Sequence, residues 1–523
     1  MSTFTINIPD LLKSLPRVAP AIVGDPERAK LSGAHDAELH YDTAIPLLNY
    51  QRAGVKYILE QPQHRALLGD SAGLGKTSQL IAVSMHAHTL GMRTLFVVPP
   101  SLRENWRREI NKFAPHLTVE VLSGAKPYKL QKTDVTVIGD ATLVPWATTL
   151  GAEGFGFVGV DESHRFKNDK AKRSVALGAI ASTVPEEGWV VLASGTPCLS
   201  RPLELVSQLQ ILGVLDRVFG SAKSFKWRYC DPQPTFIGKR TVYSYIGASN
   251  TQELHDILRS TVYIRRRKED VLTELPPKRR AQVCVALSDA DLKEYTKVED
   301  DFLAWVYAKG GSEAVLKVSR AETITRLTAL LQELGKAKVQ AGIEHIESLI
   351  DADEPVVVFA HHRSVIETIL DECAKRAVDD PRWNAVVVNG GLTDEQKQLA
   401  VDSFVSGKAN IFVGNYDSAG VGLTLTKSGD KAVTQWVGMQ TPWTPSALSQ
   451  AEDRIHRISQ VSACTAWHLT AVRKDGKETL DSRLYAMLNH KQEVVTSVLD
   501  GYGEDLGAEA GSLIASLLEE WIG

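Results

Sequence analysis

A glycine-rich stretch that ends in lysine and threonine is the first group of residues whose types and spacing indicate a chemistry. It runs from Gly69 to Thr77, directly after the apolar run 66–68 and directly before a helical pattern that begins at Ser78. Glycines allow backbone N–H groups to turn inward around phosphate oxygens, and the start of a helix adds the positive end of its dipole. We therefore predict that Lys76 reaches the β and γ phosphates of a nucleotide and that Thr77 ligates Mg²⁺.

The stretch departs from the general phosphate-loop pattern at one position, because Asp70 stands where the first glycine is usual. Gly73 and Gly75 precede the lysine, and we expect them to bring backbone N–H groups to the phosphates. The alternative interpretation is an ordinary turn that happens to contain two glycines. The position of the stretch between a strand and a helix favours the phosphate site.

Two adjacent acids, Asp161 and Glu162, end a second apolar run at residues 157–160. A carboxylate at the carboxyl end of a strand can hold Mg²⁺ through water, and the next one can orient and polarise the water that attacks the γ-phosphate. The alternative is that the pair is only the negative charge at the start of a helix. Both acids belong to the same predicted sheet as Lys76, so the combination is more specific than either part.

Two arginines near the carboxyl end of the chain form a third element. Arg454 and Arg457 are three positions apart, so on a helix they would share one face and could both stabilise transition-state charge as arginine fingers. The alternative is a solvated, charged helix in which Glu452 and Asp453 are the partners of the arginines. The presence of a phosphate loop in the same chain favours the fingers.

The elements that must position these groups follow an α/β pattern that occurs twice. Short apolar runs alternate with helical stretches from residue 45 onward, which predicts a parallel sheet. The same pattern returns after residue 345 and predicts a second α/β domain. The runs expected as strands are 66–68, 94–98, 135–138, 157–160 and 190–192 in the first domain, and 356–359, 385–388, 411–413 and 433–437 in the second.

We divide the chain into five parts. Residues 1–44 are expected to be an arm or cap, 45–285 the first domain with a helical protrusion, 286–345 a helical insertion, 346–475 the second domain, and 476–523 a helical segment. In that last segment Leu513, Leu517 and Trp521 fall one turn apart, and packing on the body is favoured over binding of a protein partner.

Composition excludes several classes of protein. The chain has 523 residues with 59 Lys plus Arg and 63 Asp plus Glu, a net charge of −4, so any nucleic-acid surface must be a local basic cleft. Five cysteines without a CxxC pair predict a reducing compartment and no metal cluster. No apolar run is long enough to span a membrane, so we expect no membrane partner and a cytoplasmic protein, bacterial or viral, or a nuclear one if eukaryotic.

The order of these motifs resembles the Swi/Snf-type ATPases of helicase superfamily two, over about residues 45–475. The resemblance rests on LNYQ, GLGKT, DESH, SGTP, GVGLTLT and QAEDRIHR at residues 48–51, 73–77, 161–164, 194–197, 420–426 and 450–457. Two longer stretches, SGTPCLSRPLEL at 194–205 and YIRRRKEDVLTELPP at 263–277, look most like the annealing-helicase, fork-remodelling branch. The resemblance implies two RecA-like domains in tandem, with ATP and Mg²⁺ as cofactors.

The resemblance also implies roles for single residues. Gln51 would read the adenine edge, Gln450 would bind the nucleotide, and residues 194–196 would link the ATP state to domain closure. The groove for nucleic acid would be lined by Ser101, Asn105, Trp106 and Thr142 in the first domain and by Thr424 and Trp443 in the second. Core packing is the alternative role for the two tryptophans.

The function predicted from the residues and the resemblance is a DNA-dependent ATPase, active as a monomer. It would move along double-stranded or forked DNA without sequence preference and remodel forks or displace bound proteins. One alternative is a strand-separating helicase, which requires a wedge. Another is an ATPase regulator bound to RNA polymerase or a replisome through the carboxyl-terminal helical segment.

One basic run keeps two interpretations. Arg265, Arg266, Arg267 and Lys268 precede the helical insertion and could grip DNA. A solvated linker, in which this run pairs with the acids at 269–270, is the favoured interpretation.

Overall fold

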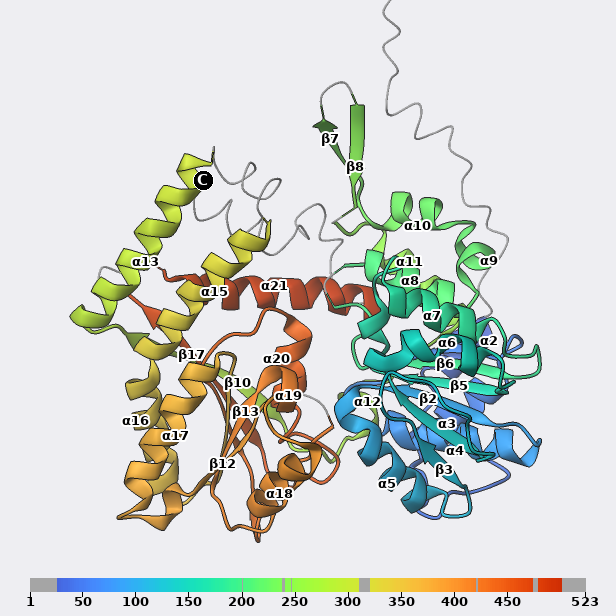
Figure 1. Ribbon diagram of the computed structural model, residues 1–523, viewed down its shortest axis with the longest axis horizontal. Coiled ribbons are helices and arrows are strands. Elements are labelled where there is room, and N and C mark those ends of the chain that lie inside the picture. The colour runs from blue at the N-terminus through green and yellow to red at the C-terminus, as the bar shows by residue number, and fades with distance from the viewer. Residues whose placement is uncertain are drawn as a thin grey trace, which may run out of the picture.

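Two parallel sheets, each covered by helices, form two lobes that lie side by side (Figure 1). The computed structural model describes residues 26–199, 201–237, 240–245, 247–309, 320–419, 422–473 and 478–500. The two sheets confirm the predicted fold class, an α/β protein with two parallel-sheet domains in tandem.

The first lobe contains seven parallel strands in the order β3-β4-β2-β5-β6-β1-β9. The five runs expected in this part of the chain all form strands, with bounds that agree within one residue. The strands are β1 (Arg65–Leu68), β2 (Thr94–Val98), β3 (Val119–Val121), β4 (Val135–Gly139), β5 (Phe157–Asp161), β6 (Trp189–Ala193) and β9 (Tyr263–Ile264).

Helices pack on both faces of this sheet because successive strand residues point to opposite sides. In β2, Leu95 and Val97 join one core cluster, whereas Phe96 and Val98 join the other. The helices of the first lobe are α2 (Pro26–Ser32), α3 (Asn49–Leu59), α4 (Lys76–Thr89), α5 (Arg103–Phe113), α6 (Leu143–Gly151), α7 (Lys172–Ala181), α8 (Leu203–Ile211), α9 (Leu215–Phe219), α10 (Ala222–Tyr229) and α11 (Thr251–Thr261). A hairpin of β7 (Gln233–Ile237) and β8 (Arg240–Ser244) projects from this lobe (Figure 1).

The second lobe contains six parallel strands in the order β10-β17-β16-β11-β13-β12. Its strands are β10 (Lys278–Ala286), β11 (Val356–Ala360), β12 (Ala385–Val388), β13 (Ile411–Asn415), β16 (Gln435–Gly438) and β17 (Cys464–Val472). Its helices are α16 (Val339–Asp351), α17 (Arg363–Ala377), α18 (Asp394–Val405), α19 (Tyr416–Ala419) and α20 (Pro445–Glu452). A short hairpin, β14 (Lys427–Ser428) with β15 (Lys431–Ala432), completes this lobe.

The position of strand β10 shows that the second domain begins before the expected boundary at residue 285. It pairs with β17 from Lys278 opposite Cys464 to Ala286 opposite Val472, so it belongs to the second sheet and not to the first domain. The strand lies at the edge of the sheet, and most of its residues are partly or fully exposed. An edge strand that begins with three basic residues lacks the continuous apolar pattern of a central strand. Short helix α12 (Lys268–Val271) lies between β9 and β10.

The helical insertion packs on the second lobe. It contains α13 (Asp289–Ala308) and α15 (Arg320–Ala337), whose apolar faces form one cluster that includes Phe302, Leu327 and Leu334. The same cluster contains Leu480 and Leu484 at the start of α21 (Leu480–Asp500).

Helix α21 runs from the second lobe to the first (Figure 1). Its beginning packs on the helical insertion, whereas Val495, Val498 and Leu499 near its end are buried in the core of the first lobe. The predicted apolar stripe of residues 513–521 lies outside the described residues. Among the helices described, none is long and apolar enough to cross a membrane.

Truncation of Leu499 tests the attachment of α21 to the first lobe. Because this side chain is buried in the core, Leu499→Ala is expected to lower the free energy of unfolding by ~2–5 kcal/mol. Urea unfolding followed by tryptophan fluorescence measures the loss. Glu493→Ala, at an exposed position of the same helix, is the control and should change it by less than about 0.5 kcal/mol. Equal stability of the two variants would contradict the attachment.

Candidate nucleotide site between the lobes

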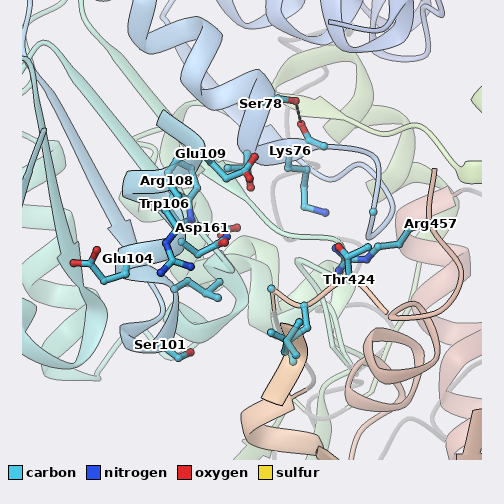
Figure 2. A pocket seen from close by; sticks show the side chains of 18 of the residues that line it. Lys76, Ser78, Ser101, Glu104, Trp106, Arg108, Glu109, Asp161, Thr424 and Arg457 are labelled. Carbon is cyan, nitrogen blue, oxygen red and sulfur yellow. Dashed lines mark hydrogen bonds between the residues drawn. The ribbon is translucent and has the colours of Figure 1, made fainter. Parts of the chain in front are cut away.

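A cavity of about 1350 Å³ lies between the lobes and is lined by residues from both. Lys76 at the start of α4 and Asp161 at the end of β5 lie on its first-lobe wall, and Arg454 and Arg457 lie on its second-lobe wall. Figure 2 shows Lys76, Arg457 and Thr424 facing the same space. Ligands of parallel α/β sheets bind at the carboxyl ends of the strands, which is where this cavity lies.

The phosphate loop connects β1 to α4. Gly73 and Gly75 have φ angles of 87° and 77°, in the left-handed region that favours glycine, and the loop thereby delivers Lys76 at the first position of α4. Lys76 Nζ donates to the carbonyl oxygens of Asp70 at 2.9 Å and Ser71 at 3.4 Å. Burial lowers the pKa of Lys76 although three nearby carboxylates, led by that of Glu162, oppose the shift. The amine is thus held by loop carbonyls that phosphate oxygens can replace.

The loop that follows β6 lies directly against the phosphate loop. A Cβ on Gly195 would be 3.2 Å from the backbone nitrogen of Ala72 and 3.3 Å from Lys76 Nζ, so a side chain here would be tightly packed against the phosphate loop. Next to it, Ser194 Oγ lies 3.0 Å from His164 Nδ1, which is 3.3 Å from Glu162 Oε2. The residues expected to link the nucleotide state to closure therefore lie against the phosphate loop and are connected to Glu162 through His164.

The two acids at the end of β5 have pKa values shifted in opposite directions. Burial and the charge of Glu162 raise the pKa of Asp161 to about 6. Burial also opposes ionisation of Glu162, but His164, Lys76 and Arg454 outweigh it and lower the pKa of Glu162 to about 2. Glu162 has a φ of 50°, an uncommon conformation for a residue with a side chain, of the kind found at functional sites. Glu162 thus stays ionised in mildly acidic solution, whereas Asp161 is the member of the pair that takes up a proton first as the pH falls below neutral.

Trp106 supports the acidic pair from inside the first lobe. Its side chain is 1% exposed, and its Nε1 donates to Asp161 Oδ2 at 3.0 Å, while the backbone nitrogen of Glu162 donates to the other carboxylate oxygen at 2.9 Å. Trp106 also lines the cavity, and its expected contact with nucleic acid stays a prediction. The structure favours the packing alternative and adds a hydrogen bond to the site.

Gln51 lies at the edge of the cavity, on the first turn of α3. Its side chain accepts from the backbone nitrogen of Leu48 at 3.0 Å and donates to the carbonyl oxygen of Leu74 at 3.0 Å. These bonds fix α3 against the phosphate loop. The position is suited to the expected contact with the base of a nucleotide bound on that loop, since Gln51 lines the cavity beside Gly75.

The arginine pair lies just beyond a helix rather than on one. Helix α20 ends at Glu452, so the expected common helix face is wrong. Turn hydrogen bonds continue past this end, and Arg454 Nε donates to the carbonyl oxygen of Gln450 at 2.9 Å while Arg457 Nη1 donates to Thr424 Oγ1 at 3.0 Å. The side chain of Gln450, predicted to bind the nucleotide, is buried outside the residues that line the cavity.

Both acids of this segment form ion pairs with basic residues of other elements, and Asp453 contacts Lys268 and Lys278 at 2.9 Å. Glu452 is fully buried and contacts Lys278 at 2.8 Å, Arg280 at 2.9 Å and His468 at 3.1 Å. The alternative of a solvated, charged helix is therefore wrong. With the acids paired behind it, the turn that contains Arg454 and Arg457 presents its guanidinium groups to the cavity; we call residues 453–457 the arginine turn.

The arginine turn meets the phosphate loop across the cavity. A Cβ placed on Gly73 would be 3.3 Å from Arg457 Cγ, so the phosphate loop and the arginine turn approach each other closely at the centre of the site. Burial and repulsion by Arg457 lower the pKa of the Arg454 guanidinium, and Glu162 opposes this shift from the other lobe. Charge from both lobes therefore converges on one space.

Some of the residues predicted to bind nucleic acid line the cavity, and others lie outside it. Ser101 and Asn105 line the first-lobe wall of the cavity, and Thr424 lines the second-lobe wall. Thr142 lies outside it and donates to the carbonyl oxygen of Gly139 at 3.1 Å. Trp443 packs on the helical insertion, in agreement with its packing alternative.

The basic run at 265–268 contains the functional residues that sequence analysis missed. Arg266 is 1% exposed and forms an ion pair with Asp70 of the phosphate loop, and Lys268 contacts Asp453 at 2.9 Å. The favoured interpretation as a solvated linker is therefore wrong, although Arg267 does pair with Asp270. The ion pair of Arg266 with Asp70 could have been predicted from Asp70 itself, because a buried acid in place of the usual glycine requires a cation.

Comparisons with known proteins identify two families along the chain. Residues 50–338 match the family described as SNF2-related domain, and residues 337–459 match the one described as helicase conserved C-terminal domain. A relative from Bos taurus, "DNA annealing helicase and endonuclease ZRANB3", is 32% identical over 89% of this chain and 42% of its own length.

A relative from Xenopus laevis, "SWI/SNF-related matrix-associated actin-dependent regulator of chromatin subfamily A-like protein 1", is 32% identical over 92% of this chain and 48% of its own length. The chain thus spans less than half the length of these curated relatives. A solved structure, "Sulfolobus solfataricus SWI2/SNF2 ATPase core in complex with dsDNA", is 20% identical with a TM-score of 0.40, over 93% of this chain and 98% of that one.

Replacement of Trp106 by phenylalanine separates its two possible roles. Trp106→Phe keeps an aromatic ring in the core but removes the donor to Asp161, so nucleotide turnover is expected to fall about tenfold through the loss of one buried hydrogen bond. DNA affinity without nucleotide should stay unchanged. Turnover and fluorescence-anisotropy titrations measure the two effects. Reduced DNA affinity with normal turnover would support a nucleic-acid contact instead.

Proposed function

The chain belongs to the family of the SNF2-related domain, and from this premise we propose that it is an ATP-dependent DNA translocase that moves along double-stranded or branched DNA. The observation that carries the proposal is the close approach of Arg457 in the second lobe to Gly73 of the phosphate loop, across a cavity that residues of both lobes line. A nucleotide bound there would be held from both lobes at once. Remodelling of forks and displacement of bound proteins are the outcomes we propose for this movement.

The first lobe would bind ATP through its phosphates. Lys76 would exchange the two loop carbonyls for β and γ oxygens, and the start of α4 would add its dipole. Gln51, already fixed on the loop, would contact the base.

The oxygen donors at this site fit Mg²⁺. The Thr77 hydroxyl and the Asp161 carboxylate both line the cavity, and hard oxygen ligands are the ones that Mg²⁺ prefers. When bound, the ion would neutralise charge on the β and γ phosphate oxygens. Glu162, which is ionised at neutral pH, would orient the attacking water and accept its proton.

The second lobe would contribute Arg454 and Arg457 to the transition state. Contacts between these guanidinium groups and the γ-phosphate exist only when the lobes are together, so ATP would favour the closed state and hydrolysis would favour opening. A chain whose lobes both grip backbone phosphates would advance along one strand as the lobes alternate. We propose that one copy of the chain is sufficient, because the cavity contains groups from both walls within a single chain.

The experiment that tests this function measures phosphate release without DNA and with duplex, forked or single-stranded DNA. Stimulation by duplex or forked DNA is expected, and DNA affinity should fall steeply as salt rises. Turnover that no DNA stimulates would overturn the proposal. A strand-displacement assay on the same forks separates a translocase from a strand-separating helicase.

Lys76→Ala should abolish ATP turnover while the chain still folds and binds DNA. The variant removes the cation expected on the γ-phosphate, whereas the loop carbonyls that held it can take up water at the cavity surface. Phosphate release, thermal unfolding and DNA anisotropy measure the three properties. Turnover at the wild-type rate would contradict the assignment of the phosphate loop.

Arg457→Ala should lower kcat by a factor on the order of 10³ and change ATP affinity much less, because an arginine finger acts in the transition state. The matched control is Arg382→Ala, a partly exposed arginine of the same lobe that pairs with Asp380. The control should retain turnover within about twofold, as expected of a surface change. Equal turnover by the two variants would exclude Arg457 from the chemistry.

A further inference from the structure

The basic run Arg265–Lys268, here called the linker segment, connects the two lobes and touches both halves of the site. It follows β9, which pairs with β1 beside the phosphate loop, and it precedes β10 of the second sheet. The backbone nitrogen of Ser71 donates to the carbonyl oxygen of Arg266 at 3.0 Å, so the segment is hydrogen-bonded to the phosphate loop along its backbone.

Arg266 binds the phosphate loop through Asp70. Its Nε donates to Asp70 Oδ1 at 2.9 Å, its Nη2 donates to Asp70 Oδ2 at 2.5 Å, and both side chains are almost fully buried. Gln79 on α4 accepts from the same guanidinium at 2.9 Å and donates to Asp70 Oδ2 at 2.9 Å. The planar guanidinium thus fixes the loop and the helix that follows it in one geometry.

The same guanidinium also reaches α3. Its Nη1 donates to the carbonyl oxygen of Tyr50, the residue before Gln51. A Cβ on Gly54 would be 2.1 Å from Gln79 Oε1 and 2.3 Å from Arg266 Nη2, so a helix position without a side chain provides the space for the guanidinium and the amide that binds it. Asp70 binds the same guanidinium, so the guanidinium cannot shift relative to α3 without disturbing its ion pair with Asp70.

Lys268 binds the arginine turn. Its Nζ donates to the carbonyl oxygen of His456 at 2.8 Å and contacts Asp453 Oδ1 at 2.9 Å, and its side chain is 7% exposed. Its Cε would be 3.5 Å from a Cβ on Gly73, so the lysine lies between the phosphate loop and the turn. Asp453 directly precedes Arg454, and His456 directly precedes Arg457. The contact of Lys268 with these two residues therefore determines where both arginines lie.

We propose that Arg266 and Lys268 are positioning residues for ATP hydrolysis, which set the distance between the phosphate loop and the arginine turn. This inference rests on the proposed function. Two residues of chain span at most about 7 Å, so a grip at each end of so short a segment leaves little freedom between loop and turn. Misplacement of a catalytic group by about 1 Å can lower a rate by about a hundredfold.

The first test replaces Lys268 by methionine, which has a similar length and no charge. Lys268→Met is expected to lower kcat at saturating DNA by at least about tenfold while the dissociation constant for ATP changes by less than about threefold, because the arginine turn acts in the transition state. Arg267→Gln is the matched control, since Arg267 lies in the same segment and pairs with Asp270 three residues on. The control should keep turnover within about twofold.

The second test adds a methyl group instead of removing a charge. Alanine normally favours a helix over glycine, but the methyl group of Gly54→Ala would displace the Gln79 amide and the Arg266 guanidinium, both of which bind Asp70. We expect Gly54→Ala to weaken ATP binding and lower kcat, in the same way as Arg266→Lys, which keeps the charge and loses the planar fork. The double variant Gly54→Ala/Arg266→Lys should lose less than the product of the two single losses.

The outcomes separate this inference from the proposed function. A wild-type chain that DNA does not stimulate would overturn the proposed function whatever the variants do. A stimulated wild type with Lys268→Met and Gly54→Ala at wild-type kcat and ATP affinity would overturn the positioning role alone. If thermal unfolding shows that Lys268→Met does not fold, Gly54→Ala and Arg266→Lys decide, and normal kinetics in both would reject the inference.

Discussion

Buried charge is the constraint on which the arrangement of the two lobes depends. Asp70 of the phosphate loop is removed from water and needs Arg266 beside it, and the buried Asp453 of the arginine turn needs Lys268. Leaving one member of such a pair unpaired in the interior costs about 3–5 kcal/mol. Each of these pairs joins segments far apart in the chain, so the pairs determine how the linker, the phosphate loop and the arginine turn lie relative to one another.

The sequence predicted the central strands and the phosphate loop because both depend on local order. A run such as 94–98 is apolar at every position after its first, which identifies a strand buried on both faces, and the step from strand to Lys76 is a contiguous motif. Strand β10 was not predicted because an edge strand can be polar and then lacks a continuous apolar run. The acidic pair and the arginine pair could be named from their residue types, but their facing one another is a property of the folded chain.

The prediction that the linker segment is solvated was wrong because it considered only the charges of neighbouring residues in the sequence. Four consecutive basic residues resemble a solvated run, yet Arg265 pairs with Asp500, Arg266 with Asp70, Arg267 with Asp270 and Lys268 with Asp453. Only the third of these partners lies nearby in sequence. Charge patterning describes a run by its neighbours along the chain, whereas burial of this run is decided by acids that the fold brings from elsewhere.

The chain crosses between the lobes at two places in the described ranges, the linker segment and α21, and the Arg265–Asp500 ion pair joins them. Arg265 Nη1 also donates to the carbonyl oxygens of Gly69 at 2.7 Å and Gly195 at 3.0 Å. Because both crossings are tied to the back of the phosphate loop, the lobes cannot separate there without breaking buried hydrogen bonds. Opening of the cavity then requires rotation about this line, with the largest displacement on the far side, where α5 and α18 meet through Arg108 and Gln398. A motion of that kind would change the distance between α5 and α18 more than the distance between Gly73 and Arg457, so in the proposed translocase a small change at the γ-phosphate would become a longer step.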